Sequence, residues 1–106
     1  MDASFLSERL ETASRTFASL ERQLADPDVA ADPARLEPIA RERARLEPLV
    51  LGHQQLLQLR EQEQQARALL REHRGELEME ALAQEELDEL APRIATLEEE
   101  LTLALL

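Results

Sequence analysis

The stretch RQLADPDVAADPARLEP, residues 22–38, decides the fold because it holds two Asp-Pro pairs, Asp26-Pro27 and Asp32-Pro33, between helix-forming segments. Proline restricts the preceding residue to extended geometry, so the first pair predicts that a helix ends near residues 24–25. The aspartate of the second pair can cap a new helix, and its proline suits the first helical position, where no amide hydrogen is needed. The pairs therefore predict a stop and a start, joined by a short connection over residues 28–31.

Apolar residues on either side of this stretch recur with the heptad period of packed helices. Steps of four and three residues run without a break through the first segment, at Leu6, Leu10, Ala13, Phe17, Leu20 and Leu24. The same steps run through the last segment, at Ala83, Leu87, Leu90, Ile94, Leu97, Leu101 and Ala104. Such a stripe is typical of a helix that lies against partner helices.

The middle segment has helical but less regular spacing, and Pro38 and Pro48 lie inside it. An interior proline costs about 3 kcal/mol in a straight helix, so we expect a kink at one of them, or a helix that begins only at Pro38. Gly75 can adopt the left-handed conformation that closes a helix. The prediction is an all-α fold in a single domain, an antiparallel three-helix bundle with a long coiled-coil hairpin. The expected helices span residues 3–25, 33–73 and 76–105.

Composition narrows the class of protein. A chain of 106 residues allows one domain, and with only 2% aromatic residues its core must be aliphatic. The absence of cysteine excludes disulfides and cysteine metal sites. No apolar run approaches the roughly 20 residues that span a bilayer, and the N-terminus lacks the basic start and apolar core of a signal peptide. We therefore expect a soluble cytoplasmic protein.

The formal net charge of −11 is concentrated at the C-terminal end. Residues 75–106 hold ten acidic groups against Arg93 alone, whereas residues 1–74 hold 13 acidic groups and 11 arginines. Such a surface repels phosphate, so direct nucleic-acid binding is disfavoured and a basic protein surface is the better neighbour. A solvated helix face is the simpler interpretation of the same charge. The candidate partner-contact residues are Glu78, Glu80, Glu85, Glu86 and Glu89.

The sequence contains no motif for catalysis, cofactor binding or metal binding. It has no glycine-rich phosphate loop and no nucleophile elbow. His53 and His73 are the only histidines, and an exposed or rim position fits both better than a metal site. Paired carboxylates abound, but a slim aliphatic bundle offers no pocket to shift their pKa values. We predict that the chain is not an enzyme and binds no cofactor.

The segment RQLADPDVAADPARLEPIARERARLEPLV, residues 22–50, resembles the start of bacterial class I peptide chain release factors, especially the type that reads UAA and UAG. The shared features are the two Asp-Pro pairs and the Leu-Glu-Pro-hydrophobic-Val step at residues 46–50. Further on, residues 78–87 are similar to a family run of Glu-Met-x-x-Met-Ala-x-Glu-Glu-Leu. Three departures are Leu82 in place of the second Met, the extra Pro38, and Gly75-Glu76-Leu77 in place of an Asp-Pro.

The resemblance implies an N-terminal helical domain that docks the factor on the ribosome, near the stalk base, during stop-codon-dependent termination. The family's Gly-Gly-Gln loop, which supports peptidyl-tRNA hydrolysis, is absent, as are its codon-reading elements. The resemblance therefore implies a fragment of a longer multidomain protein, cut near the leucine cluster at residues 101–106. The implied partners are the ribosome, the remaining release-factor domains and the methyltransferase that modifies the loop glutamine, with no membrane and no sequence-specific nucleic acid.

A second hypothesis is a stand-alone coiled-coil adaptor that binds a partner helix through an exposed apolar stripe. The two hypotheses differ at the C-terminal leucines Leu103, Leu105 and Leu106. In the first they form a severed joint with the next domain, and in the second they form a working contact.

Overall fold

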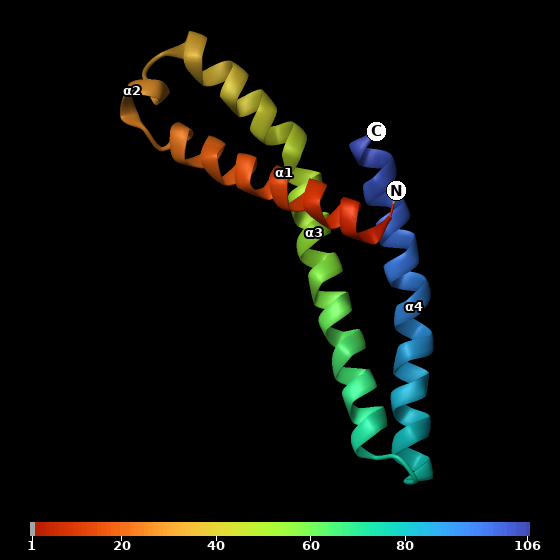
Figure 1. The fold of residues 1–106 in the computed structure, drawn as a ribbon. Helices are drawn as coiled ribbons and strands as arrows, with labels where there is room; N and C mark the ends of the chain where they lie inside the picture. Colours follow the sequence, from red (N-terminus) through yellow and green to blue (C-terminus); the bar gives the residue numbers. More distant parts are fainter. Residues whose placement is uncertain (1) are drawn as a thin grey trace.

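A computed structural model describes residues 2–106 and confirms the predicted all-α fold (Figure 1). Besides the three long helices that were predicted, it contains one short helix. The elements are α1 (Ala3–Leu24), α2 (Pro27–Ala30), α3 (Pro33–Glu72) and α4 (Leu77–Leu105). The molecule is elongated, with extents of 65 × 27 × 18 Å and a radius of gyration of 19.2 Å. A compact domain of this length would have a radius of gyration of about 13 Å.

Helix α1 begins at a side-chain cap and ends at the first Asp-Pro pair. The carboxylate of Asp2 accepts a hydrogen bond from the backbone N–H of Phe5 at 2.9 Å, which satisfies one of the free amides of the first turn. The predicted stripe is the buried face, because Leu6, Leu10 and Ala13 are all buried. The helix stops at Leu24, as the geometry required before Pro27 dictates.

The connection over residues 28–31 differs from the prediction, because it lies largely within the one-turn helix α2. Both aspartates of the Asp-Pro pairs are N-caps: Asp26 accepts from the amide of Asp28 at 2.9 Å, and Asp32 from that of Ala34 at 3.2 Å. In each pair the proline occupies the first turn of its helix. Val29 is buried, which holds the turn against the neighbouring helices. The first pair thus ends α1 and also starts α2.

Helix α3 runs unbroken for 40 residues, about 60 Å at the usual rise per residue, and sets the long axis of the molecule. Pro38 and Pro48 both lie inside it, and the helix begins at Pro33, so the later start considered for Pro38 does not occur. The cap at Asp32 already nucleates the helix, and Pro38 removes only a single backbone bond near its start. Figure 1 shows α3 changing direction between its yellow and green parts. The assignment of this bend to Pro38 or Pro48 stays a prediction.

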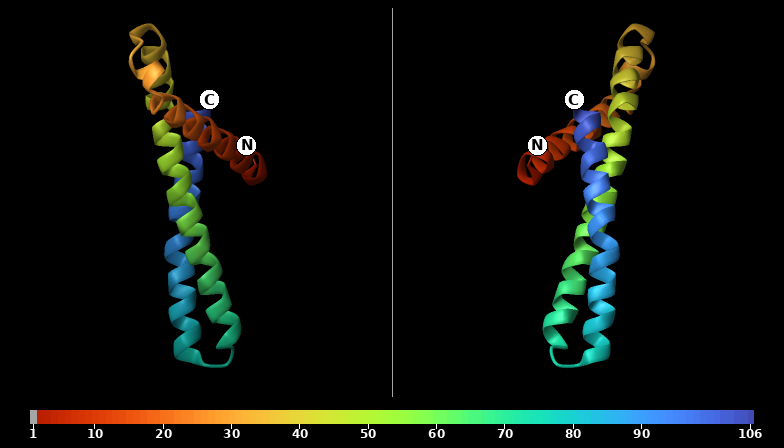
Figure 2. Two further views of the ribbon diagram at one scale, coloured as in Figure 1. Left: turned by 90° about the vertical axis from the view of Figure 1, so that its left-hand side faces the viewer. Right: turned by 90° about the vertical axis from the view of Figure 1, so that its right-hand side faces the viewer.

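Helices α3 and α4 form a long antiparallel hairpin, and they lie side by side in every view (Figures 1 and 2). Gly75 closes the turn with a φ of +93°, a left-handed conformation that disfavours any side chain. Near the other end, Gly52 lets the two helices approach closely, since an added Cβ would lie 2.4 Å from Cδ2 of Leu101. Pro92 lies inside α4 without ending it.

Three of the four most deeply buried leucines, Leu6, Leu10 and Leu56, lie where α1 crosses the hairpin, a region that we call the junction and define by these residues; the fourth is Leu90 of α4. These three side chains are at most 1% exposed. Helix α1 packs mainly on α3 and contacts α4 much less, and its N-terminal end projects from the hairpin (Figure 2). The opposite end of the hairpin, residues 66–86, is made by two helices alone, and we call it the tip. Its buried residues are the small Ala66 and Ala83.

Candidate functional site

The five candidate contact glutamates all lie on the half of α4 nearest the tip, but they do not share one face. Glu78, Glu85, Glu86 and Glu89 are exposed, and spacings of three, four and seven residues bring them to one flank of the helix. Glu80 is half-buried and turns back to the loop, where it accepts a hydrogen bond from the amide of Gly75 at 2.6 Å. The structure therefore groups four of the five, and their contact with a partner stays a prediction.

Exposed leucines lie among these four glutamates. Leu82 is 61% exposed and Leu77 is 80% exposed, although both belong to the helix that forms the tip. Leu69 of α3 is 43% exposed and stands on the facing helix. A groove of about 330 Å³ runs between the two helices here. We call it the apolar groove; its lining residues are Gln62, Gln65, Ala66, Leu69, Met79, Leu82, Ala83 and Glu86.

A second groove of about 540 Å³ continues the first along the same side of the hairpin, and Gln62 lines both. We call it the polar groove; it is lined by Gln55, Gln58, Leu59, Gln62, Pro92, Arg93, Thr96, Leu97 and Glu100. On α3, steps of three and four residues from Gln55 to Leu69 place the lining residues on one face. The α3 wall is uncharged over this length, although a third of the chain is charged.

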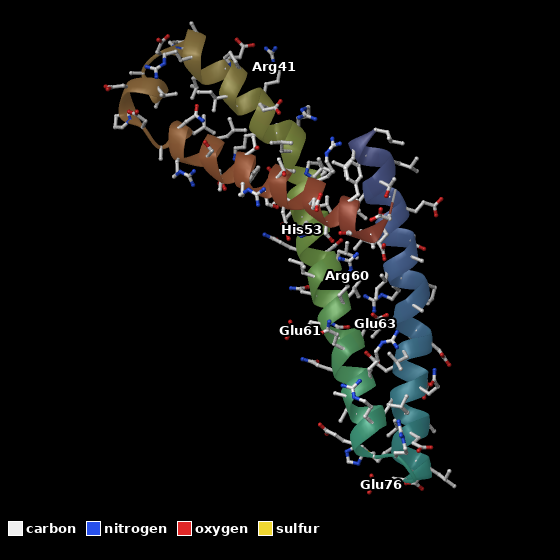
Figure 3. The ribbon with its side chains drawn as sticks, viewed as in Figure 1. Arg41, His53, Arg60, Glu61, Glu63 and Glu76 are labelled. Carbon is white, nitrogen blue, oxygen red and sulfur yellow. The ribbon has the colours of Figure 1, made fainter. Side chains whose placement is uncertain are left out.

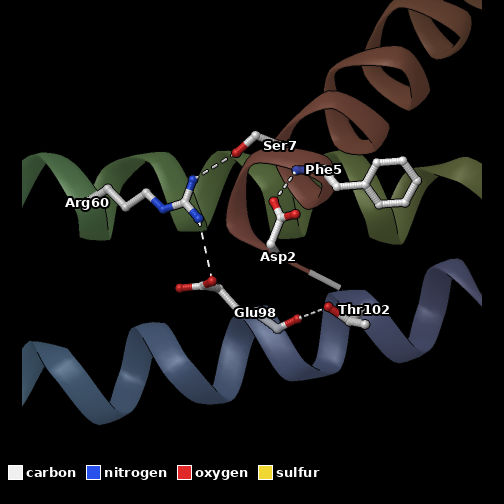
Figure 4. A network of polar contacts seen from close by, with 6 residues as sticks. All are labelled: Asp2, Phe5, Ser7, Arg60, Glu98 and Thr102. Atoms are coloured by element: carbon white, nitrogen blue, oxygen red, sulfur yellow. Dashed lines mark hydrogen bonds and ion pairs between the residues drawn. The ribbon is translucent and has the colours of Figure 1, made fainter.

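The junction holds polar contacts that sequence reasoning missed. Arg60 of α3 donates to the hydroxyl of Ser7 on α1 at 3.1 Å, and its other nitrogen lies 3.6 Å from the carboxylate of Glu98 on α4 (Figure 4). One guanidinium therefore joins all three long helices. Arg60 and His53 both lie where α1 crosses α3, far from Glu76 at the turn (Figure 3).

His53 is buried, at 8% exposure, so the exposed or rim position expected for it was wrong. Its Nδ1 lies 3.3 Å from the hydroxyl of Ser14 on α1, and that hydrogen bond makes the burial tolerable. A signal for this existed in the sequence. Ser7 and Ser14 are seven residues apart, as are His53 and Arg60, and antiparallel packing pairs them in reverse order.

A third polar contact joins α1 to α3 further from the junction. Arg43 lies 2.9 Å from the carboxylate of Glu47 on its own helix and 3.5 Å from that of Glu21 on α1. Its guanidinium also sits over the ring of Phe17, 4.8 Å from the centroid. Glu21 follows Ser14 by a further seven residues, so one polar row of α1 meets polar partners along α3.

The described residues offer no arrangement typical of chemistry. Within residues 2–106, no group of three or more histidines and carboxylates could hold a metal ion. His73 contacts the carboxylate of Glu76 beside the turn, at the surface. A hydrogen bond from Arg45 lowers the pKa of Glu42, but both side chains are open to solvent on α3. No helix in this part of the chain combines the length and apolar character needed to cross a membrane.

The described residues thus form an extended helical module. The sequence matches the PCRF domain over residues 13–106, and the chain belongs to that family, the N-terminal domain of peptide chain release factors. The resemblance read from the Asp-Pro pairs is confirmed. No solved structure was found to match the chain significantly.

Three curated relatives that the chain matches are all named peptide chain release factor 1. The chain is 36% identical over 99 residues to peptide chain release factor 1 of Geobacillus kaustophilus (strain HTA426), covering 93% of this chain and 27% of that protein. It is 35% identical over 98 residues to the Listeria welshimeri protein of that name, with shares of 92% and 27%. For the protein of that name from Chlorobaculum tepidum the identity is 30% over 99 residues, with shares of 93% and 28%. The chain therefore spans about a quarter of the length of the relatives it matches.

Proposed function

We propose that this chain is the ribosome-docking domain of a peptide chain release factor that acts in stop-codon-dependent translation termination. The observation that carries the proposal is the family match over residues 13–106, to relatives named peptide chain release factor 1. In this proposal the chain contributes no chemistry of its own. Peptidyl-tRNA hydrolysis and the reading of UAA and UAG belong to other domains of the parent protein, and the site of action is the cytoplasm.

The shape supports a docking role. The hairpin extends well beyond the junction, and a 65 Å rod can reach a surface distant from the rest of a multidomain protein. At and just beyond the tip, α4 carries the four exposed candidate glutamates together with exposed leucines rather than a uniformly polar surface. We propose that the domain binds the stalk-base region of the ribosome. The remaining release-factor domains are the second partner, and the methyltransferase that modifies the Gly-Gly-Gln loop is the third.

A domain exchange tests this function. The 99 matching residues of the Geobacillus kaustophilus relative would be replaced by this chain, giving a protein we call the chimera. We expect the chimera to sediment with ribosomes and to release peptide at a stop codon. A variant that lacks the domain should bind ribosomes more weakly, because the docking contacts are gone.

The control is the same relative with an unrelated helical hairpin in place of the domain. If the chimera binds ribosomes no better than this control, the chain does not dock and the proposal is wrong. If binding is restored but release is not, the domain docks in a non-productive orientation, which contradicts the role in termination.

The alternative, a coiled-coil adaptor, is favoured by the exposure of Leu103 and Leu106, at 64% and 90%. An adaptor would use these leucines, with Leu105, as its contact surface. Replacing the three by serine should abolish the binding of a specific partner if the chain is an adaptor. In the docking function, the same variant of the chimera should keep its tip-dependent ribosome binding.

A further inference from the structure

The side of the hairpin that holds the apolar and polar grooves is left uncovered by the fold. Helix α1 packs on a different side of α3, through the row that contains His53 and Arg60. The groove residues of α3 follow another row, Gln55, Gln58 and Gln62. Two antiparallel helices that lack a third partner leave an elongated depression, and another helix is the element that fits it.

The apolar groove has the composition of a binding site rather than of a solvated surface. Its floor is the small pair Ala66 and Ala83, which lets a visiting side chain approach closely. Leu69 and Leu82 stand on its two walls with roughly half of their surface exposed. Neither leucine contributes much to the core, so the chain gains little stability from having them there.

The charge around the apolar groove indicates what kind of partner helix it would bind. Glu86 lines the groove, and Glu89, three residues further along α4, lies on the same flank. Glu86 is the only charged residue that lines the apolar groove, and no basic residue lines it. The α3 wall offers glutamine amides, which donate and accept hydrogen bonds without repelling either sign of charge. The acidic rim formed by Glu86 and Glu89 therefore attracts basic side chains and repels the phosphates of RNA.

We propose that the apolar groove binds a basic amphipathic helix of a partner protein, with leucine-like side chains between Leu69 and Leu82 and basic side chains over the acidic rim. The inference rests on the proposed docking function and names the chemistry of the docked partner. The two grooves together extend from Gln55 to Leu69 along α3, about 21 Å, which matches a helix of about 14–18 residues. The polar groove receives the end of that helix beside Arg93 and Glu100.

Binding of defined peptides tests the inference. The probe is a fluorescent helical peptide of about 18 residues with leucines at every third and fourth position and lysine or arginine on both flanks. The control peptide has the same sequence with glutamate in place of every lysine or arginine. Fluorescence anisotropy at about 0.15 M salt should show binding of the basic peptide at least about tenfold tighter than of the acidic one.

Matched variants separate the groove from general acidity. Leu69→Ser with Leu82→Ser should weaken binding by about tenfold or more, because buried apolar anchors dominate helix-in-groove contacts. Leu57→Ser is the control, since Leu57 is 51% exposed on α3 and lies outside both grooves. Glu86→Gln with Glu89→Gln should weaken binding by about two- to fivefold. The same neutralisation at Asp88 and Glu99, on α4 but outside the grooves, should have no effect.

Equal weakening in the test and control variants would show attraction to bulk acidity and would overturn the proposal. So would leucine-dependent binding of a bare ribosomal RNA fragment in place of the peptide. Leucine-dependent dimerisation in sedimentation would make the groove a contact between two copies and would also overturn it.

The same leucine variants in the chimera separate this inference from the docking function. If they lower ribosome sedimentation while the basic peptide never binds, the helix is the wrong occupant and docking stands. If the peptide binds through the groove but the chimera does not sediment with ribosomes, the docking function fails and the groove chemistry stands.

Discussion

The junction and the tip are built from the same two helices, yet they differ in what holds them together. At the junction a third helix covers α3, leucines are almost fully buried, and Arg60 joins three helices. At the tip two helices bury only small residues and leave leucines exposed. Among the described residues, the ion pairs near the tip stay within α3 or beside the turn. The difference indicates that stability is concentrated at the junction, and the exposed tip is where we propose partner contact.

The largest effect should come from removing a junction leucine. Leu56 is 0% exposed, so Leu56→Ala should lower the free energy of unfolding by about 2–5 kcal/mol. Its neighbour Leu57 is 51% exposed, and Leu57→Ala should change it by less than about 0.5 kcal/mol. Urea titration of the two variants and of the unchanged protein measures both changes in the free energy of unfolding. Similar losses in the two would mean that the junction is not the stabilising core.

A smaller effect is expected where the hairpin helices approach most closely. Gly52→Val should cost about 1–3 kcal/mol, because the new side chain meets Leu101. A double-mutant cycle with Leu101→Ala measures the contact, since the pair should cost less than the sum of its single changes. Strict additivity of the two would show that the close approach carries no energetic weight.

At the tip, Gly75→Ala should cost about 1–2 kcal/mol, because a Cβ is disfavoured at a φ of +93°. No atom outside the turn lies within 4 Å of the added Cβ, so backbone conformation alone accounts for the loss. Hydrogen exchange should show the loss of protection confined to residues around the turn. Equal loss of protection at the junction would contradict the separation of the two regions.

The smallest effect concerns Glu42, whose pKa is lowered by its hydrogen bond from Arg45. A lowered carboxyl pKa contributes stability that is present above the ordinary value of 4.5 and is lost as the pH falls through the lowered value. Both side chains are open to solvent, so the effect is small. Glu42→Gln should lower the midpoint of thermal unfolding only slightly at about pH 7 and leave it unchanged at about pH 2. A clear change in the unfolding midpoint at about pH 2 would contradict this predicted pH dependence.

Much of the fold was open to prediction because its signals are local. The Asp-Pro pairs predicted where helices stop and start, and the heptad steps predicted the buried faces of α1 and α4. The one-turn helix α2 was missed because its four residues, from Pro27 to Ala30, are too few for a periodic signal. The buried position of His53 was missed because its partner Ser14 is 39 residues away. The candidate contact glutamates were predicted from charge alone. Charge could not show that Glu80 turns back to the loop while the other four are exposed.

Local signals in the sequence specify the three long helices, where they end, and which stripes of α1 and α4 are apolar, because capping, proline geometry and side-chain periodicity act within a few residues. Local signals do not specify that α1 covers one side of the hairpin at the junction and leaves the other side open. That choice depends on contacts between residues far apart in the chain, such as Ser7 with Arg60, 53 residues away. The uncovered groove exists because three helices of unequal reach meet at one end and only two continue to the other.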